Sequence, residues 1–448
     1  MIRAVGNYEF FITDAGKEIG TYDACDGTYV FCRGEISEAD CKDYLERLAA
    51  DGFELRESSL LGGNLYYFLT GNGVSTYVSF LRDAAELRVY AEPAGFSVAP
   101  KKSFGKAGNG PVKLFQIPAD TTGTRQNGGM AYALQLSDGN FVMIDGGYYT
   151  DTEADGIYKV LRDNTPEGRK PHIYAWFMTH MHGDHYGGMI RFAEKYAADC
   201  ELDGYYFSSF LVQGTSCWLG MSDKFYVLRD MWAENERPEV YSKLHTGMDF
   251  DFAGVSVKVV CTQEDVYPNS FIDANDTSTV LRIDVGEQRV LMLGDCRDNE
   301  CIAMQKAFEK NGELKCDIVQ YSHHGYEGAT KEFYEVVDAS VILFPMDIVG
   351  WQENYKTVPQ DVFRIWFNRL VKPANDYLAE YMANGHIKKV IVSGAGLATI
   401  SFPYVPDSEV ILDYEAYYEE HKHEVPDGYE LKGYAYTDES KTKIEKII

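Results

Sequence analysis

The sequence predicts a mixed α/β protein built from a small N-terminal α+β domain and a larger second domain. Residues 172–179 (HIYAWFMT) form a short, mostly apolar run that fits a buried strand, and residues 187–197 fit the start of a helix. The run HMHGDH, residues 180–185, lies between them. With 448 residues, 45% of them hydrophobic, the chain is long enough for two cores.

The N-terminal domain is predicted to span residues 1–105. Ser37 is expected to cap a helix whose apolar stripe has the spacing i, i+3, i+4 and i+7, formed by Cys41, Tyr44, Leu45 and Leu48. Residues 65–70 and 75–80 alternate on either side of Gly71-Asn72-Gly73 and predict a hairpin. Residues 100–111, rich in glycine and lysine, are expected to be a linker. The role of the domain as a lid, a dimerisation unit or a packing unit stays open. The tyrosines at 66, 67 and 77 are expected in its core or in cross-strand pairs.

The HMHGDH run offers three imidazoles and one carboxylate at i, i+2, i+4 and i+5. This set of ligands suits a pair of transition-metal ions held close together. Chance surface histidines are a poor explanation, because three of only ten histidines fall within these six positions. The sequence therefore predicts up to two divalent metal ions, with zinc first and manganese or iron as alternatives.

This run resembles the HxHxDH signature of the metallo-beta-lactamase fold superfamily, and further landmarks of that family follow the same order. They are residues 141–147 (FVMIDGG), 290–295 (VLMLGD) and 317–325 (DIVQYSHHG). The resemblance covers roughly residues 112–403. It implies a metallo-beta-lactamase-like four-layer αββα sandwich within a hydrolase domain of residues 106–448, which ends in an acidic extension.

The resemblance also implies roles for individual residues. The implied metal ligands are His180, His182, Asp184, His185, Asp295 and His324. Asp295 would bridge the two ions, and Asp145 would brace the metal loop. Asp145, Asp184 and His323 are the predicted catalytic residues. His324 is preferred to His323 as the last ligand because Gly325 follows it. His323 is left to bind a substrate phosphate, to protonate the leaving oxygen, or to orient another ligand.

The first metal site has a gap in its predicted ligand set. Many members of the family place a further histidine between the HxHxDH motif and the bridging aspartate, but His245 is the only histidine between His185 and Asp295. Its position favours a surface or outer-shell role. Water, Asp273 or Asp276 is expected to fill the gap.

Three features resemble one branch of the superfamily, which contains the hydrolase domain of bacterial competence proteins and the choline-phosphate esterases of teichoic acid. They are residues 275–283 (NDTSTVLRI), the His323-His324-Gly325 run and residues 248–259. The branch implies hydrolysis of a small phosphodiester or phosphate ester by a hydroxide that bridges two metal ions. A lactone, lactam or thioester hydrolase is the alternative, and a non-catalytic binding protein with a vestigial site is a third reading.

Charge and composition limit the partners. With 42 basic and 69 acidic residues the net charge is -27, which disfavours long nucleic acid and favours a small anionic ester that the metals attract. No apolar run approaches the roughly 20 residues of a membrane span. We therefore expect a cytoplasmic protein without membrane contact, compatible with a homodimer. The nine cysteines form no CxxC pair, and Cys296 is expected to be buried filler. Glu419, His421 and His423 are expected on a solvated face of the tail.

Overall fold

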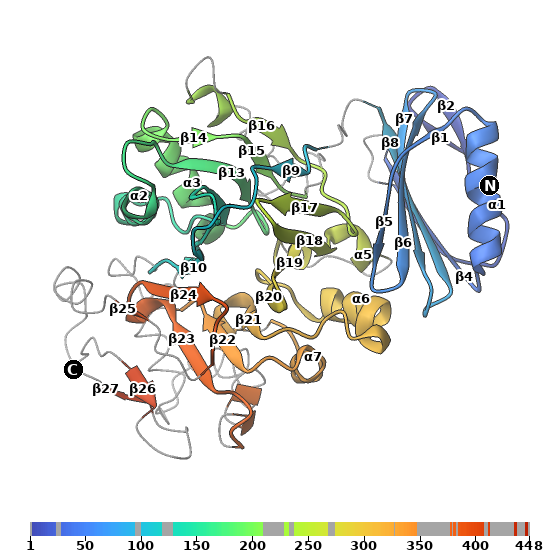
Figure 1. Cartoon of the computed structure of the whole chain (residues 1–448). Helices are drawn as coiled ribbons and strands as arrows, with labels where there is room; N and C mark the ends of the chain where they lie inside the picture. Colours follow the sequence, from blue (N-terminus) through green and yellow to red (C-terminus); the bar gives the residue numbers. More distant parts are fainter. Residues whose placement is uncertain are drawn as a thin grey trace, which may run out of the picture.

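The computed structural model describes residues 2–23, 28–94, 100–118, 129–208, 228–232, 237–267, 274–326, 328–346, 377–378, 380–381, 384–406, 411–412, 434–436 and 444–446. Two large sheets and a separate N-terminal sheet organise the described part of the chain (Figure 1).

The first large sheet has the strand order β16-β15-β13-β12-β11-β10-β24-β25, with β14 pairing beside β13. Its half from β12 to β16 is parallel, so the carboxyl ends of these strands meet at one edge. Its strands are β10 (Val112–Gln116), β11 (Tyr132–Gln135), β12 (Phe141–Ile144), β13 (His172–Phe177), β14 (Glu201–Leu202), β15 (Gly204–Tyr206), β16 (Glu239–Tyr241), β24 (Ala398–Phe402) and β25 (Ile411–Leu412).

The second large sheet has the order β23-β22-β21-β20-β19-β18-β17-β9. Strands β20 to β23 are parallel to one another, and they again bring several carboxyl ends to one edge. Its strands are β9 (Ser103–Phe104), β17 (Asp249–Phe252), β18 (Val255–Cys261), β19 (Val280–Val285), β20 (Gln288–Met292), β21 (Ile318–Gln320), β22 (Val341–Phe344) and β23 (Lys389–Val392).

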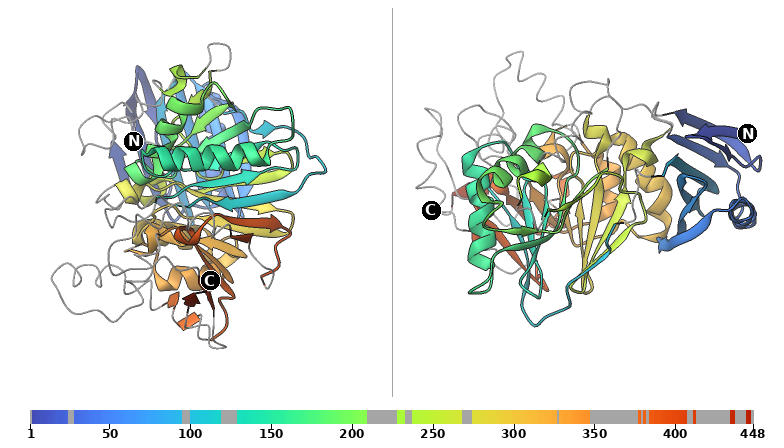
Figure 2. Two further views of the ribbon diagram at one scale, coloured as in Figure 1. Left: turned by 90° about the vertical axis from the view of Figure 1, so that its left-hand side faces the viewer. Right: turned by 90° about the horizontal axis from the view of Figure 1, so that it is seen from above.

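The two sheets face each other across the main core, where Leu114 and Val142 of one sheet join a buried cluster with Val257 and Val290 of the other. Helices cover the outer faces. On the first sheet these are α2 (Asp151–Asn164) and α3 (Gly183–Tyr196), and on the second sheet α6 (Asp298–Phe308) and α7 (Lys331–Val337). The order helix, sheet, sheet, helix is visible from above (Figure 2). It confirms the metallo-beta-lactamase-like four-layer fold that the sequence predicts.

The N-terminal unit is a six-stranded sheet of order β3-β4-β8-β7-β6-β5 with α1 (Glu38–Ala50) on one face. Ser37 caps α1, and Cys41, Tyr44 and Leu48 are buried beneath it, as predicted. The predicted hairpin is also present. The strands are β3 (Lys17–Asp23), β4 (Tyr29–Gly34), β5 (Glu54–Leu61), β6 (Asn64–Gly71), β7 (Val74–Leu81) and β8 (Glu86–Pro93), and a small pair, β1 (Ile2–Val5) and β2 (Tyr8–Phe11), lies beside them.

Two sequence predictions need correction. The helix expected at residues 187–197 begins four positions earlier, at Gly183, so Asp184 and His185 lie in its first turn. A carboxylate in the first turn is favoured by the helix dipole. The pattern of apolar residues contains no information about this effect, so it places the start of the helix too late. The predicted linker is also partly a strand, because Ser103 and Phe104 form β9 and pair with β17 in the second sheet.

The remaining short elements are α5 (Gln263–Val266), η2 (Ala274–Thr277), η3 (Glu309–Asn311), η4 (Ser322–Gly325), η5 (Ser393–Ala395), β26 (Tyr434–Tyr436) and β27 (Ile444–Lys446). Among the described residues, no helix has the length and apolar character that crossing a bilayer requires. The tail residues Glu419, His421 and His423 lie outside the described residues, and so does Asp273.

Candidate metal centre

The HMHGDH run leaves β13 at the edge where the carboxyl ends of β12 and β13 meet. Asp145 follows β12 and is completely buried. Its carboxylate accepts hydrogen bonds from the backbone N–H of Thr179 and from the Thr179 hydroxyl, both at 2.7 Å. Its second oxygen also lies 2.7 Å from His185 Nδ1. Asp145 therefore ties the start of the metal loop to one of its histidines, which is the bracing geometry expected of it.

This contact orients the His185 ring. A carboxylate at Nδ1 directs Nε2 of the same ring toward the interior of the site. Burial raises the pKa of Asp145. Within the described chain Asp145 belongs to neither group of potential metal ligands, so it acts on the site through His185 and Thr179.

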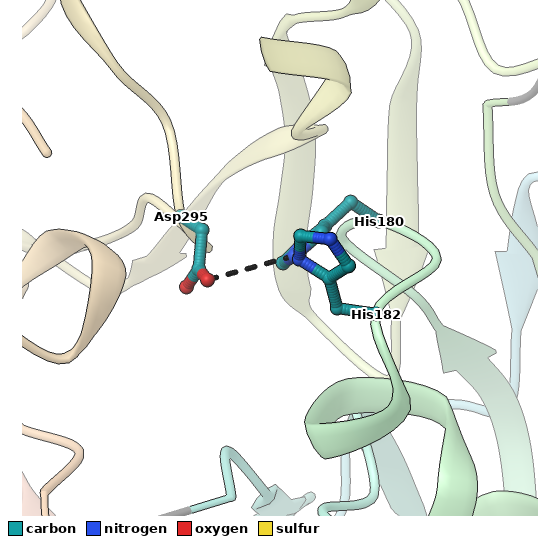
Figure 3. A group of neighbouring side chains, drawn as sticks. All are labelled: His180, His182 and Asp295. Atoms are coloured by element: carbon teal, nitrogen blue, oxygen red, sulfur yellow. Dashed lines mark hydrogen bonds and ion pairs between the residues drawn. The ribbon is translucent and has the colours of Figure 1, made fainter. Parts of the chain in front are cut away.

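The six predicted ligands gather in two groups. His180, His182 and Asp295 form the first, and Asp184, His185 and His324 form the second; within each group the donor atoms lie within 4.8 Å of one another. His180 and His182 leave the loop before α3, while Asp295 reaches them from the segment after β20 (Figure 3). His180 Nε2 lies 3.1 Å from His182 Nδ1 and 3.6 Å from an Asp295 carboxylate oxygen. The ligands from the two large sheets thus converge at one place.

Asp295 lies between the two groups. Its Oδ2 faces His180, while its Oδ1 lies 3.3 Å from His185 Nε2 and 3.6 Å from His324 Nε2. Hydrogen bonds hold the strand end that presents it: the backbone N–H of Asp295 donates to the Ser278 hydroxyl, and that of Gly294 donates to the Gln320 side chain. One carboxylate therefore contacts both groups, as a bridging ligand would.

The electrostatics of Asp295 fit a bound cation. Its side chain is 2% exposed, and Oδ1 has no hydrogen-bond partner among the described residues. Oδ1 faces His185 Nε2 and His324 Nε2 without a hydrogen bond to either, and a cation among these three atoms would replace the water that burial removes. Burial alone would raise the pKa of Asp295, but the histidines around it hold that pKa well below its usual range. The carboxylate is thus ionised and aimed at a position that a metal ion would fill.

A backbone carbonyl outside the second group orients one of its ligands, His324. His324 is buried, its Nδ1 contacts the Pro345 carbonyl at 2.6 Å, and its Nε2 lies 3.3 Å from His185 Nε2 and 3.4 Å from Asp184 Oδ2. A carbonyl at Nδ1 fixes the proton there and leaves Nε2 free to bind a metal. This is the geometry predicted for His324.

His323 points elsewhere. It belongs to neither group, and its Nε2 lies 3.9 Å from Asp295 Oδ2 and 3.0 Å from the side-chain amide of Asn275. Both histidines have left-handed backbone angles, with φ of 50° and 53°, so η4 turns sharply and sends the two rings apart. His323 is therefore at the rim of the first group, where it can reach a substrate. Its role, like that of Asp184, stays a prediction.

Water, Asp273 or Asp276 was expected to fill the gap in the first site, and Asp273 lies outside the described residues. Asp276 is buried but belongs to neither group within the described residues. The side chain beside the first group is Asn275, the first residue of the NDTSTVLRI run. Asparagine is not one of the residue types that define a histidine and carboxylate pattern, so only its place in that run marks it in the sequence.

His245 is not a surface residue. It is 2% exposed, and its Nδ1 lies 2.8 Å from Glu264 Oε2. Its ring stacks on Tyr77 of the N-terminal sheet. The expectation of a surface position is therefore wrong, because the N-terminal unit covers this segment. Cys296 is buried, as expected of filler.

The sequence matches no family model and no curated protein. Among solved structures, zinc-bound PqqB from Methylobacterium extorquens is 11% identical, with 47% of this chain and 72% of that chain covered and a TM-score of 0.32. The short form of human tRNase Z is 12% identical, with 51% and 91% covered and a TM-score of 0.30. Yeast PDE1 is 11% identical, with 63% and 97% covered and a TM-score of 0.38. Similarity at this level assigns no activity to the chain.

Proposed function

We propose that this protein is a metal-dependent hydrolase of small phosphate esters with two adjacent metal ions. The observation that carries the proposal is the Asp295 carboxylate, which lies between two groups of ligands and directs one oxygen to each of them. His180, His182 and Asp295 would hold one ion, and Asp184, His185, His324 and Asp295 the other. Such ions, when bound, lower the pKa of water and neutralise charge that grows on substrate oxygens.

The side chains around the first group support a phosphoryl rather than a carbonyl substrate. Arg297 follows Asp295 by two residues and is half-buried at the start of α6. Its Nη2 lies 3.3 Å from the Asn275 side-chain amide, which in turn contacts the first group. A guanidinium matches the oxygens of a phosphoryl group and would stabilise the extra negative charge of its transition state. A neutral lactone or lactam carbonyl has less need of this cation.

His323 offers a proton to the leaving oxygen. Its ring lies at the rim of the first group, with a side chain that is 17% exposed, so it can reach both the substrate and solvent. General acid catalysis of this kind contributes roughly 10²–10⁴-fold to hydrolysis. The net charge of -27 favours a small substrate over a polynucleotide, because every further phosphate would add repulsion.

The test is a substrate panel on protein loaded with zinc or manganese. It contains bis-p-nitrophenyl phosphate, p-nitrophenyl phosphate, p-nitrophenyl phosphorylcholine, a homoserine lactone and a cephalosporin. We expect turnover of at least one phosphate ester, and a larger loss of kcat/KM in Arg297→Met for that ester than for any carbonyl substrate. Faster turnover of the lactone or the cephalosporin, with no effect of Arg297→Met on the phosphate esters, would show that the substrate class is wrong.

A further inference from the structure

The first group has fewer protein ligands than the second. Three side chains, His180, His182 and Asp295, surround the first position, whereas the second position has its own three ligands and the other oxygen of Asp295. Zinc in proteins is bound by four ligands in a tetrahedral arrangement, and at catalytic sites one of these is water or substrate. The first position therefore has room for one more donor atom.

The Asn275 side-chain amide occupies that place. One of its two terminal atoms lies 3.1 Å from His180 Nε2, 3.3 Å from Asp295 Oδ2 and 2.6 Å from His182 Nδ1. Ligand atoms around a tetrahedral zinc ion with bonds of 2.0–2.1 Å are roughly 3.3 Å apart. The five distances known among the four atoms, from 2.6 to 3.6 Å, are close to this spacing, as expected of four ligands around one ion.

The surrounding fold fixes this position. Asn275 is 3% exposed and lies in η2, between α5 and β19. Two contacts hold the residues that follow it: the N–H of Thr279 donates to the carbonyl of Thr179, and Ser278 accepts from the backbone N–H of Asp295. The segment is therefore anchored to both strand ends that supply the first group.

Two orientations of the amide are conceivable, and they differ in what they imply. With nitrogen turned inward, Asn275 would donate to His180, His182 and Asp295 and would plug the site. An amide nitrogen carries only two hydrogens, so it cannot satisfy three acceptors. With oxygen turned inward, a cation at the centre satisfies all four atoms at once, and the outward nitrogen donates to His323 Nε2 at 3.0 Å.

Arg297 is the contact that opposes this orientation. Its Nη2 lies 3.3 Å from the outward amide atom, where an oxygen would be the better partner. The guanidinium is on a long side chain at the start of a helix, and it can turn to a bound anion. His180, His182 and Asp295 have no such freedom, because the two sheets fix their backbone positions.

We propose that Asn275 is a ligand of the first metal ion, with its side-chain oxygen standing where related sites have a further histidine; the proposal rests on the metal centre of the proposed function. An amide oxygen is a neutral, hard ligand, so it binds zinc more weakly than an imidazole does and suits manganese or magnesium better. The first ion should then bind more weakly than the second and exchange with the medium.

The test is a metal titration of the full chain, followed by calorimetry and elemental analysis and, with Co²⁺, by visible absorption. We expect two binding steps in the wild type. Asn275→Leu removes the oxygen at similar size, and it should weaken the first-site step by at least about tenfold while leaving the other step unchanged. Asn275→Asp restores an oxygen and adds charge, so it should bind the first ion at least as tightly as the wild type.

Three histidine variants assign the steps. His182→Ala should lose the same ion as Asn275→Leu, and His324→Ala should lose the other. His323→Ala should keep both ions and lose only turnover. If Asn275→Leu binds both ions as tightly as the wild type or more tightly, the amide is a plug and the proposal is overturned. A wild-type chain that binds no metal would instead refute the proposed function. The thermal unfolding of metal-free Asn275→Leu and Asn275→Asp shows whether each variant is folded.

Discussion

The metal centre and the contact between the two domains both bury histidines beside carboxylates, but the two regions arrange them differently. At the domain contact each polar group faces one partner: Lys243 Nζ lies 3.4 Å from Glu92 and 2.8 Å from the Tyr90 hydroxyl, and His245 lies 2.8 Å from Glu264. At the metal centre the nitrogens of four histidines and two carboxylates point at two common positions.

This difference in arrangement distinguishes polar groups that are buried for stability from polar groups that are buried to bind a ligand. At the domain contact each group faces one partner, although Glu92 Oε1 and His245 Nε2 make no hydrogen bond among the described residues. At the metal centre several ligand atoms surround one point, where a cation can bind all of them at once. Asp295, which directs one oxygen to each group, is the clearest sign of this second kind. Convergence, more than burial or a perturbed pKa, is what identifies the site.

The largest effect that would sharpen this comparison comes from removing charge from the converging set. Asp295→Ala and Asp184→Ala should each lower hydrolysis by at least about 10³-fold, because each removes a ligand charge from the metal centre. The metal-free variants should unfold below the wild-type temperature, because the neighbouring histidines lower the pKa of both carboxyls and so stabilise the folded state near neutral pH. Hydrolysis rates and thermal unfolding in chelator measure both effects.

Asp249→Ala is the matched control. Its carboxylate is exposed on β17 and accepts from Ser256, away from both groups of ligands. It should leave the rate and the metal content unchanged. Full activity in Asp295→Ala or Asp184→Ala would mean that the reaction takes place elsewhere in the molecule.

The layers and the ligands could be predicted from the resemblance to the metallo-beta-lactamase fold superfamily, because the motifs that carry it are short and local. A buried strand followed by HMHGDH places His180 to His185 at a strand end whatever the rest of the chain does. The position of Asn275 could not be predicted in this way, because it depends on how η2 is anchored to two strand ends from different sheets. The same holds for His245, whose burial comes from Tyr77, a residue of the other domain.

The domain contact should respond to the loss of one partner. Lys243 and Glu92 have side chains that are 2% and 0% exposed, so Lys243→Met leaves a buried carboxylate without its cation. We expect the free energy of unfolding to fall by about 3–5 kcal/mol, as for other broken buried pairs. The double variant Lys243→Met with Glu92→Leu should recover most of that loss. Urea unfolding of the three proteins measures both terms.

Lys315→Met provides the control for this prediction. It breaks the pair with Asp338, whose side chains are 63% and 43% exposed, and should cost less than about 1 kcal/mol. If Lys243→Met is no worse than Lys315→Met, the domain contact is not a buried pair. The domain contact and the metal centre would then not differ in the way proposed here for their buried charged groups.

The smallest effect concerns the protonation of His245. Burial lowers the pKa of His245 to about 3, and the charges of Glu92, Lys243, Asp265 and Lys102 modify it. An unfolded histidine titrates near pH 6.5, so the unfolded chain takes up a proton below that pH while the folded chain does not. The stability that comes from the buried neutral ring is therefore present above about pH 6.5 and is lost as the pH falls toward 3.

Other buried groups act in the opposite direction, so a comparison with a variant is needed to isolate His245. Burial raises the pKa of both Glu92 and Glu264, and these carboxyls favour the folded state as the pH falls. Subtracting His245→Gln from the wild type removes their common contribution. Between about pH 7.5 and pH 5 the wild type should lose about 2 kcal/mol of unfolding free energy relative to His245→Gln, as measured by urea unfolding. A difference that stays constant would show that His245 has the same pKa in the folded and unfolded chains, and that burial does not keep the ring neutral.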